Sequence, residues 1–454
     1  MKRSLLFVIS GLIILSMLLA ACGPQATPVS PAETEAPPAE TEAPPAETEA
    51  PPAAEPIKIG SSLPITGGFA INGQKHKDGY QLCVDLINEK GGLLGRQVEL
   101  IVSDNQSDAD TAIAQTERMI NVDNVDLIFG TFSSALTFPM TSITEQAKMV
   151  HPIPAGAALR IYSRGYKYIF YFQQNAAEYV GATPVEMIMN LVSPDEQPKT
   201  AAVVHADDFF ANAIATGLMG GAVTVEGLEN PVEISSALDA AGIEVVFSQQ
   251  WPESGFSDWI NLANSLKTAN ADLVMGLTAS PDETIQLVRA MQTVGYQPKG
   301  VYLSQGTQEE FKEGVGDAVN GIMIHSAWHP NVDFVGELAG EPFSNSDFIA
   351  AFQAKFNRMP DEDEAIPFSL CMGMEQAVRG VGSTDNDAIR EWFASRSADS
   401  PVRTILGEYY WDERGLPINR PFLMTQWQDG ELKFVYPVGQ FPGTSDLLWP
   451  KPEW

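Results

Sequence analysis

The residues best placed to bind a small molecule are two adjacent serines between an expected strand and an expected helix. Ser133 and Ser134 follow the apolar run 125–129 and precede a helical pattern that starts at Ala135. The first backbone N–H groups of a helix lack partners within it, and serine is common at that position. Such N–H groups bind carboxylates and other anions. The serines could instead only cap the helix, but the position favours a carboxylate site.

A serine hydrolase is the alternative interpretation of Ser133 and Ser134. Such an enzyme needs a base within hydrogen-bond reach of its serine. The five histidines are His76, His151, His205, His325 and His329. His151 is the nearest of these in sequence, and no motif places it beside either serine. We therefore expect a binding protein with no catalytic residues.

Metal and cofactor motifs fail on spacing. His325 and His329 are four residues apart, but 321–324 reads as a strand and Pro330 follows, so about 13 Å would separate the two positions. The acidic run 361–364 lacks the spacing and glycine of a calcium loop, and we expect it to be a solvated surface. The sequence contains no Gly-x-Ser-x-Gly, Walker or His-Glu-x-x-His motif. We predict no metal and no cofactor.

Short apolar runs alternate with helical patterns along most of the chain. Strands are expected at 57–60, 98–102, 125–129, 150–153, 201–205, 243–247, 273–277, 301–303 and 322–324. Helices are expected at 74–90, 109–121, 134–147, 179–192, 257–268 and 282–294. This alternation predicts an α/β fold in which parallel sheets are covered by helices on both faces. Such sheets bind ligands at the carboxyl ends of their strands, where the two serines lie.

Length and charge narrow the class of protein. The chain has 454 residues and a formal net charge of −31, which makes nucleic acid an unsuitable partner. With the first 56 residues set aside, 398 residues remain. That number suits two lobes of roughly 150–200 residues each.

The first 56 residues read as a signal and a tether. Lys2 and Arg3 precede a short apolar run, so we predict a signal peptide over residues 1–21. Residues 19–22, Leu-Ala-Ala-Cys, resemble the lipobox of bacterial lipoproteins, which implies lipidation of Cys22 and a membrane anchor. Residues 22–56 contain three copies of Pro-Ala-Glu-Thr-Glu-Ala-Pro and are expected to form an extended spacer.

The two other cysteines lie far apart in sequence. Cys83 and Cys371 each fall within a helical pattern, and neither has a CxxC neighbourhood. An exported protein could join them in a disulfide. Two buried free thiols are the favoured prediction, because cysteine packs readily among apolar side chains.

Six segments in the same order resemble the branched-chain amino acid-binding proteins, the extracellular solute-binding proteins of ABC transporters with the type I periplasmic binding fold. They are 63–73 (LPITGGFAING), 87–96 (INEKGGLLGR), 104–108 (DNQSD), 130–135 (GTFSSA), 154–157 (PAGA) and 411–415 (WDERG). The resemblance covers nearly all of residues 57–436. It implies two Rossmann-like lobes joined by three crossovers, with the ligand in the cleft. Matching motifs imply lobe 1 at 57–176 and 328–418, and lobe 2 at 177–327 and 419–454.

The resemblance also implies ligand-binding residues. In this family a serine after the third strand and the backbone of the next loop hold the ligand carboxylate, and an aromatic residue closes over the ligand. The matching positions, with Asn72 from the first motif, are Ser133, Ser134, Ala155, Gly156, Ala157, Phe210 and Asn72. With Phe209 adjacent, we expect one phenylalanine in the core and Phe210 in the cleft.

Two positions depart from the family pattern. Where relatives often have a threonine, this chain has Ala158, so one hydrogen bond is missing or comes from elsewhere. The acidic residue that pairs with the ligand's ammonium group falls on Gln305. A neutral amide cannot balance that charge. Either Asp207 or Asp208 substitutes, or the ligand carries no ammonium group.

The expected function is therefore capture of a small amino acid, carboxylate or amide. The expected partners are that ligand, an ABC permease and, through the lipid anchor, a membrane. The expected location is the cell envelope outside the cytoplasm. A ligand-sensing receptor domain would share the same lobes and cleft, and the sequence leaves that alternative open.

Overall fold

The computed structural model describes residues 54–224, 229–418, 420 and 422–454. The predicted signal peptide, the lipidation site Cys22 and all but the last three residues of the tether lie outside these ranges, as does residue 419, the predicted start of the last segment of lobe 2. Within the described part, no helix is both long and apolar enough to cross a membrane.

A three-stranded parallel sheet forms the centre of the first lobe. Its strand order is β2-β1-β3, and its strands are β1 (Ile57–Leu63), β2 (Val98–Asp104) and β3 (Leu127–Ile128). Helix α1 (Ala70–Glu89) connects β1 to β2, helix α2 (Ala109–Asn121) connects β2 to β3, and helix α3 (Ser134–Gln146) follows β3. A small parallel pair follows, β4 (His151–Ile153) and β5 (Ile169–Tyr171), with α4 (Leu159–Tyr162) between them. Each strand therefore delivers its carboxyl end to a loop before a helix, as the alternating pattern predicts.

A seven-stranded mixed sheet forms the centre of the second lobe, in the order β18-β17-β12-β11-β10-β6-β9. Five neighbouring strands are parallel: β6 (Thr200–Ala206), β9 (Glu244–Trp251), β10 (Leu273–Leu277), β11 (Gly300–Leu303) and β12 (Ile322–Ser326). The antiparallel pair β17 (Leu423–Gln428) and β18 (Glu431–Tyr436) completes the sheet beside β12. All residues of β10 are buried, which explains its continuous apolar sequence.

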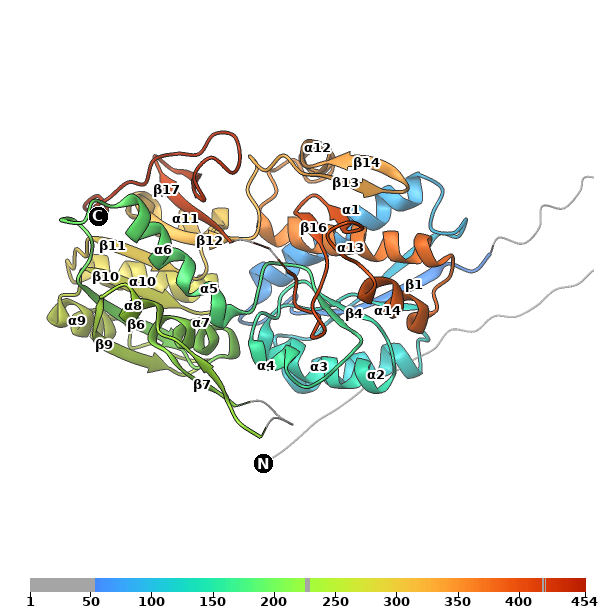
Figure 1. Ribbon diagram of the computed structural model, residues 1–454, viewed down its shortest axis with the longest axis horizontal. Helices are drawn as coiled ribbons and strands as arrows, with labels where there is room; N and C mark the ends of the chain where they lie inside the picture. The colour runs from blue at the N-terminus through green and yellow to red at the C-terminus, as the bar shows by residue number, and fades with distance from the viewer. Residues whose placement is uncertain (1–53, 225–228, 419, 421) are drawn as a thin grey trace, which may run out of the picture. The chain divides into compact units, whose positions relative to one another are not determined.

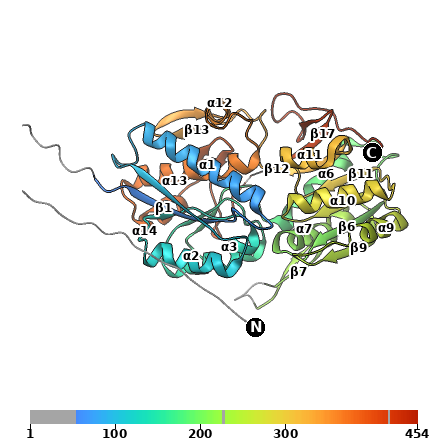
Figure 2. The same cartoon turned by 180° about the vertical axis from the view of Figure 1, so that it is seen from behind.

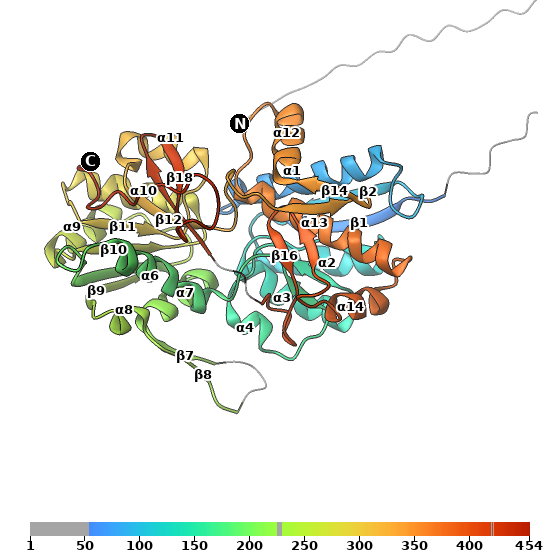
Figure 3. The same ribbon diagram turned by 45° about the horizontal axis from the view of Figure 1, so that its top comes forward.

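Helices cover both faces of this sheet. Figures 1 and 2 show α6 over one face and α10 over the other. The helices of this lobe are α5 (Ala177–Val180), α6 (Ala182–Leu191), α7 (Phe209–Met219), α8 (Ala237–Ala240), α9 (Trp259–Ala269), α10 (Pro281–Thr293) and α11 (Glu309–Val315), followed by a 3-10 turn at Gly316–Val319. Strands β7 (Gly221–Val223) and β8 (Val232–Ile234) form an antiparallel pair that extends away from the sheet in Figure 3.

The helix expected at 179–192 is two helices in the structure, α5 and α6, which meet at Gly181. Pro184 explains the break, because proline has no amide hydrogen to donate to the preceding turn. Proline is tolerated in the first turn of a new helix, and Pro184 is the third residue of α6.

The chain returns to the first lobe after β12. There it forms β13 (Val335–Leu338), β14 (Glu341–Ser344), α12 (Asn345–Phe356), α13 (Glu362–Val381), α14 (Asn386–Ala394), β15 (Val402–Thr404) and β16 (Gly407–Tyr409). One core cluster contains residues of β1, α1, α12, α13 and α14. The chain thus passes between the lobes three times, after β5, after β12 and before β17. The lobe boundaries near 176, 328 and 418 remain predictions.

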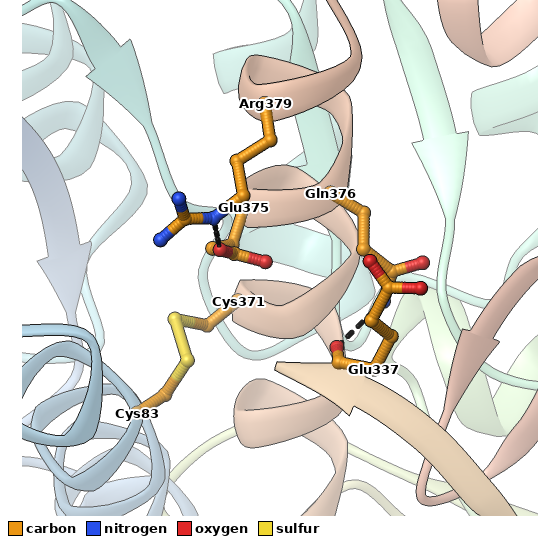
Figure 4. The surroundings of a disulfide bond; sticks show 6 residues. All are labelled: Cys83, Glu337, Cys371, Glu375, Gln376 and Arg379. Atoms are coloured by element: carbon orange, nitrogen blue, oxygen red, sulfur yellow. Dashed lines mark hydrogen bonds and ion pairs between the residues drawn. A yellow bond between two sulfur atoms is a disulfide. The ribbon is translucent and has the colours of Figure 1, made fainter. Parts of the chain in front are cut away.

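Cys83 and Cys371 form a disulfide, so the expectation of two free thiols is wrong (Figure 4). The Cα atoms of the two cysteines are 6.3 Å apart, although 288 positions separate them in sequence. The bond joins α1 to α13, which pack side by side. The sequence did not reveal this pairing because nothing local brings two helices from distant parts of the chain together.

Candidate functional site

A small cavity lies where loops of the two lobes meet. Its volume is about 40 Å³, room for roughly three water molecules. The first lobe contributes Phe132, Ser133, Ser134, Ala155, Gly156, Ala157, Tyr171, Gln173, Glu362, Asp363 and Ile366, and the second contributes Phe210, Ala279, Gln305 and His325. Seven of the predicted ligand-binding residues line it: Ser133, Ser134, Ala155, Gly156, Ala157, Phe210 and Gln305.

Five small residues form what we call the loop wall of the cavity: Ser133, Ser134, Ala155, Gly156 and Ala157. Ser133 is the N-cap of α3 and its side chain makes no capping hydrogen bond. The usual capping hydrogen bond between the serine hydroxyl and the first N–H groups of the helix is therefore not formed here. Ser134 Oγ accepts a long hydrogen bond of 3.4 Å from the N–H of Ala158. This arrangement suits a carboxylate or another anion.

Gly156 is held tightly against α3. A Cβ atom at this position would lie 2.8 Å from Thr137 Cγ2 and 2.9 Å from Ile153 Cγ2. The carbonyl of Gly156 also accepts a 2.6 Å hydrogen bond from the hydroxyl of Tyr162. Only glycine lets the 155–157 loop approach the start of α3 this closely.

Aromatic side chains of the second lobe complete one side of the cavity. The ring centroids of Phe210 and His325 are 6.2 Å apart. His325 Nδ1 lies 2.7 Å from the hydroxyl of Tyr302, and burial lowers the pKa of His325 to about 4. His325 is therefore neutral at pH 7. Phe209 instead packs on Phe138 of the first lobe, at 5.2 Å between ring centroids.

The run 361–364 begins α13, and the expectation of a solvated surface there is wrong. Asp361 is the N-cap and forms a capping box with Glu364. Asp363 is 4% exposed and Glu364 is fully buried. Glu362 and Asp363 line the cavity. With Gln305 they form what we call the acidic wall.

Glu362 sits among three donors. Its carboxyl group receives the hydroxyl of Thr307 at 2.8 Å, the N–H of Ala327 at 2.7 Å and a 3.0 Å contact from Ser326 Oγ. Ser326 Oγ also lies 2.5 Å from the carbonyl oxygen of Trp328, and the hydroxyl has only one proton to donate. If Ser326 donates this proton to Trp328, the hydrogen bond between Ser326 and Glu362 requires a proton on the Glu362 carboxyl group. Burial and the charge of Asp363 raise the pKa of Glu362 to about 8, in agreement with a protonated side chain at pH 7.

Asp363 is held by amides from both lobes. Its Oδ2 accepts from Asn72 Nδ2 at 3.0 Å and from Gln308 Nε2 at 2.7 Å. Its Oδ1 is 3.8 Å from His76 Nε2, which is beyond hydrogen-bond reach. Asn72, a predicted site residue, does not line the cavity but connects Asp363 to Gln305, at 3.5 Å from the Gln305 oxygen.

An ion pair next to the acidic wall also joins the lobes. Lys75 of α1 contacts Asp361, and its Nζ lies 2.8 Å from Glu310 Oε2 of α11. Although burial disfavours a charged amine, these carboxylates raise the pKa of Lys75. Lys75 is thus paired with two acidic side chains beside the cavity.

Asp207 and Asp208, the two candidates to replace the family's acidic residue at position 305, lie outside the cavity. Among the described residues that line the cavity, neither Asp207 nor Asp208 occurs. Asp208 caps α7, and its carboxylate accepts from Ala211 N–H at 2.7 Å and Ala279 N–H at 3.2 Å. Asp207 is exposed and contacts Asn212 and Gln250.

Eight residues that line the cavity were not predicted as ligand-binding residues from the sequence: Phe132, Tyr171, Gln173, Ala279, His325, Glu362, Asp363 and Ile366. One signal could have identified the two acids. Asp361 and Glu364 have the spacing of a capping box, and the residues that follow are almost all apolar. The start of a helix that is buried on all sides cannot be a free surface.

Comparisons with known proteins show the family of this chain. A family model described as periplasmic binding protein matches residues 56–431. This chain belongs to the periplasmic binding protein family. A Leu/Ile/Val-binding protein homolog of Brucella suis is 26% identical over 84% of this chain and 91% of its own length. The predicted family is therefore confirmed.

Solved structures show the same fold. The substrate binding protein of a branched-chain amino acid transporter from Streptococcus pneumoniae, in complex with isoleucine, has a TM-score of 0.69 at 19% identity, over 83% of this chain and 98% of its own. A solute binding protein from R. palustris in complex with benzoate has a TM-score of 0.65 at 18% identity, over 88% and 98%. The fold is the predicted two-lobed type I periplasmic binding fold.

Proposed function

We propose that this protein is an extracytoplasmic solute-binding lipoprotein that captures a small amino acid, or a related carboxylate or amide, and delivers it to an ABC permease. The proposal rests chiefly on one observation: residues of both lobes line a single cavity that includes the uncapped start of α3. Membership of the periplasmic binding protein family supports it.

Opening of the lobes would admit the ligand. The cavity, at about 40 Å³, is too small to hold an amino acid unless its walls move apart, and ligand binding between lobes favours their closed state. Contacts that hold the lobes together surround the cavity, among them Lys75 to Glu310 and Gln308 to Asp363. A ligand that adds contacts to both lobes would stabilise this arrangement.

Thermal-shift screening followed by calorimetric titration tests the binding role. The panel contains L-amino acids, their amides and simple carboxylates including benzoate, and a binder is expected to raise the melting temperature. The ligand should be recovered unchanged from the complex. Release of hydrolysis products would instead favour the serine hydrolase, with Ser133 or Ser134 as nucleophile.

Membrane fractionation tests the anchor. The Cys22→Ser variant should leave the membrane fraction or accumulate as a precursor, while its soluble domain binds the same ligands. Equal membrane association of variant and wild type would contradict lipidation at Cys22. Uptake of the bound solute by cells with and without this protein then separates delivery to a permease from the alternative role of a ligand-sensing receptor domain.

A further inference from the structure

We propose that Asp363 accepts a cationic group of the captured ligand, so that the cavity selects a zwitterion over a simple carboxylate or an amide. This inference rests on the proposed function and names the ligand class within it. It places the acid on α13 of the first lobe, at a position that differs from Gln305 and from Asp207 and Asp208.

The free oxygen of Asp363 is the first argument. Both side-chain hydrogen bonds to this carboxylate are accepted by Oδ2, from Asn72 and Gln308. Oδ1 belongs to a residue that lines the cavity, and its nearest basic group, His76 Nε2, is 3.8 Å away. Asp363 is only 4% exposed, so little water can reach this oxygen, and an N–H donor from a ligand would supply the hydrogen bond it needs.

The surroundings of Asp363 are short of donors. The amide oxygens of Asn72 and Gln308 are buried and have no hydrogen-bond partner. The oxygen of Gln305 already faces Asn72 at 3.5 Å and Gln308 at 3.2 Å. Both ring nitrogens of His76 are also buried without a partner, and one of them is an N–H donor because the ring is neutral. The unpartnered acceptors, which are the two amide oxygens and the other His76 nitrogen, outnumber this one donor, and that balance suits a group with several N–H donors, such as an ammonium.

No cation within the described residues is free to pair with Asp363. The titratable groups that face it are His76 and Lys75 of α1 and Asp361, Glu362 and Glu364 of α13. Burial lowers the pKa of His76 to about 3, so this histidine is neutral, and Lys75 is paired with Asp361 and Glu310. The wall therefore has a net negative charge when Asp363 is ionised.

A zwitterion satisfies both walls at once. Its carboxylate can take the start of α3, and its ammonium group can take Asp363 Oδ1. A simple carboxylate such as benzoate would instead add a second negative charge to a small cavity that already contains the Asp363 carboxylate. Burial and the charge of Asp361 raise the pKa of Asp363 to about 6, so this carboxyl group is largely ionised at pH 7.5.

Matched ligand pairs that differ only by the ammonium group test this inference. The probes are alanine and propionate, valine and isovalerate, leucine and isocaproate, and phenylalanine and hydrocinnamate, titrated by calorimetry at pH 7.5 into wild type and Asp363→Asn. We expect each amino acid that binds to bind more tightly than its partner. Asp363→Asn should weaken the amino acid by at least about 30-fold and leave the carboxylate unchanged or tighter.

Asp110→Asn is the matched control, since this aspartate is exposed on α2. A second measurement needs only the wild-type protein: in two buffers of different ionisation enthalpy, the carboxylates should take up more protons on binding than the amino acids do. Equal proton uptake, a preference for carboxylates, or equal effects of Asp363→Asn and Asp110→Asn would overturn the inference alone. If no amino acid, carboxylate or amide binds, the proposed function itself fails and the inference with it.

Discussion

The loop wall and the acidic wall of the cavity are built in different ways. The loop wall comes from segments that directly follow strands, residues 133–134 after β3 and 155–157 after β4. It has no titratable side chain, and its binding groups are hydroxyls and backbone N–H groups. The acidic wall joins Gln305, after β11, to the first turn of α13, more than fifty residues later.

This difference teaches which part of a binding site a local pattern can reveal. A strand, two small polar residues and a helix define the serine part of the loop wall within a dozen positions, and residues 155–157 directly follow the next strand. The acidic wall exists only because α1, α13 and the 305–308 loop meet, as the contacts of Asp363 with Asn72 and Gln308 show. Its charge therefore depends on packing that no short segment encodes.

Removal of the disulfide tests how far the acidic wall depends on the packing of α1 against α13. It is the variant for which we expect the largest effect. Cys83→Ala with Cys371→Ala removes the covalent link between α1 and α13. The free energy of unfolding should fall by about 2–5 kcal/mol, because a long loop is no longer closed in the unfolded chain. Urea denaturation measures this, with reduced wild type as the control. The double variant and reduced wild type should agree; if oxidised wild type matched them too, the link would contribute nothing.

A glycine in the loop wall gives the next largest effect. Gly156→Ala should weaken ligand binding by about 1–3 kcal/mol, because the new Cβ would lie 2.8 Å from Thr137 Cγ2 and displace the 155–157 loop from α3. Calorimetry with the tightest amino acid of the panel measures the loss. Gly68→Ala is the matched control, since its Cβ would meet nothing within 4 Å. Equal affinities for the two variants would mean that the close approach has no role in binding.

The fold could be predicted further from sequence than the site could. The helix at 109–121 and the strand at 273–277 have the bounds expected from their patterns, because Asp108 caps the helix and the strand is buried on both faces. Helix 179–192 was expected as one element because the apolar spacing continues past the break before Pro184. The acidic run was expected at the surface because charge alone does not reveal burial.

The acidic wall should contribute to the pH dependence of stability, together with Glu178 and Asp208, whose pKa values burial raises to about 7. Glu362 and Asp363 have raised pKa values, about 8 and about 6, because they are buried beside other acids. Groups with raised folded-state pKa values bind protons on folding, so their contribution is fully present below about pH 4 and is lost as the pH rises to about 8. Ligand-free protein should therefore melt at a lower temperature at pH 8 than at pH 6.

Charge-removing variants separate this local effect from the overall negative charge. Glu362→Gln should flatten the decline between pH 6 and pH 8. Glu117→Gln, which removes an exposed charge on α2, should leave the slope unchanged. Identical slopes for the two variants would mean that Glu362 does not contribute to the pH dependence.

The smallest effect is expected from Ser133→Ala. This change deletes one hydroxyl at the start of α3, while the backbone N–H groups of the first turn remain available to a carboxylate. We expect ligand affinity to fall by about 1 kcal/mol, the usual worth of one hydrogen bond, with little change in stability because the side chain makes no capping hydrogen bond. Ser163→Ala, a serine at the end of α4 that does not line the cavity, is the control for calorimetry. A loss as large as that of Asp363→Asn would place the main donor of the loop wall on a side chain. The contrast between a wall made of backbone and a wall made of charge would then no longer hold.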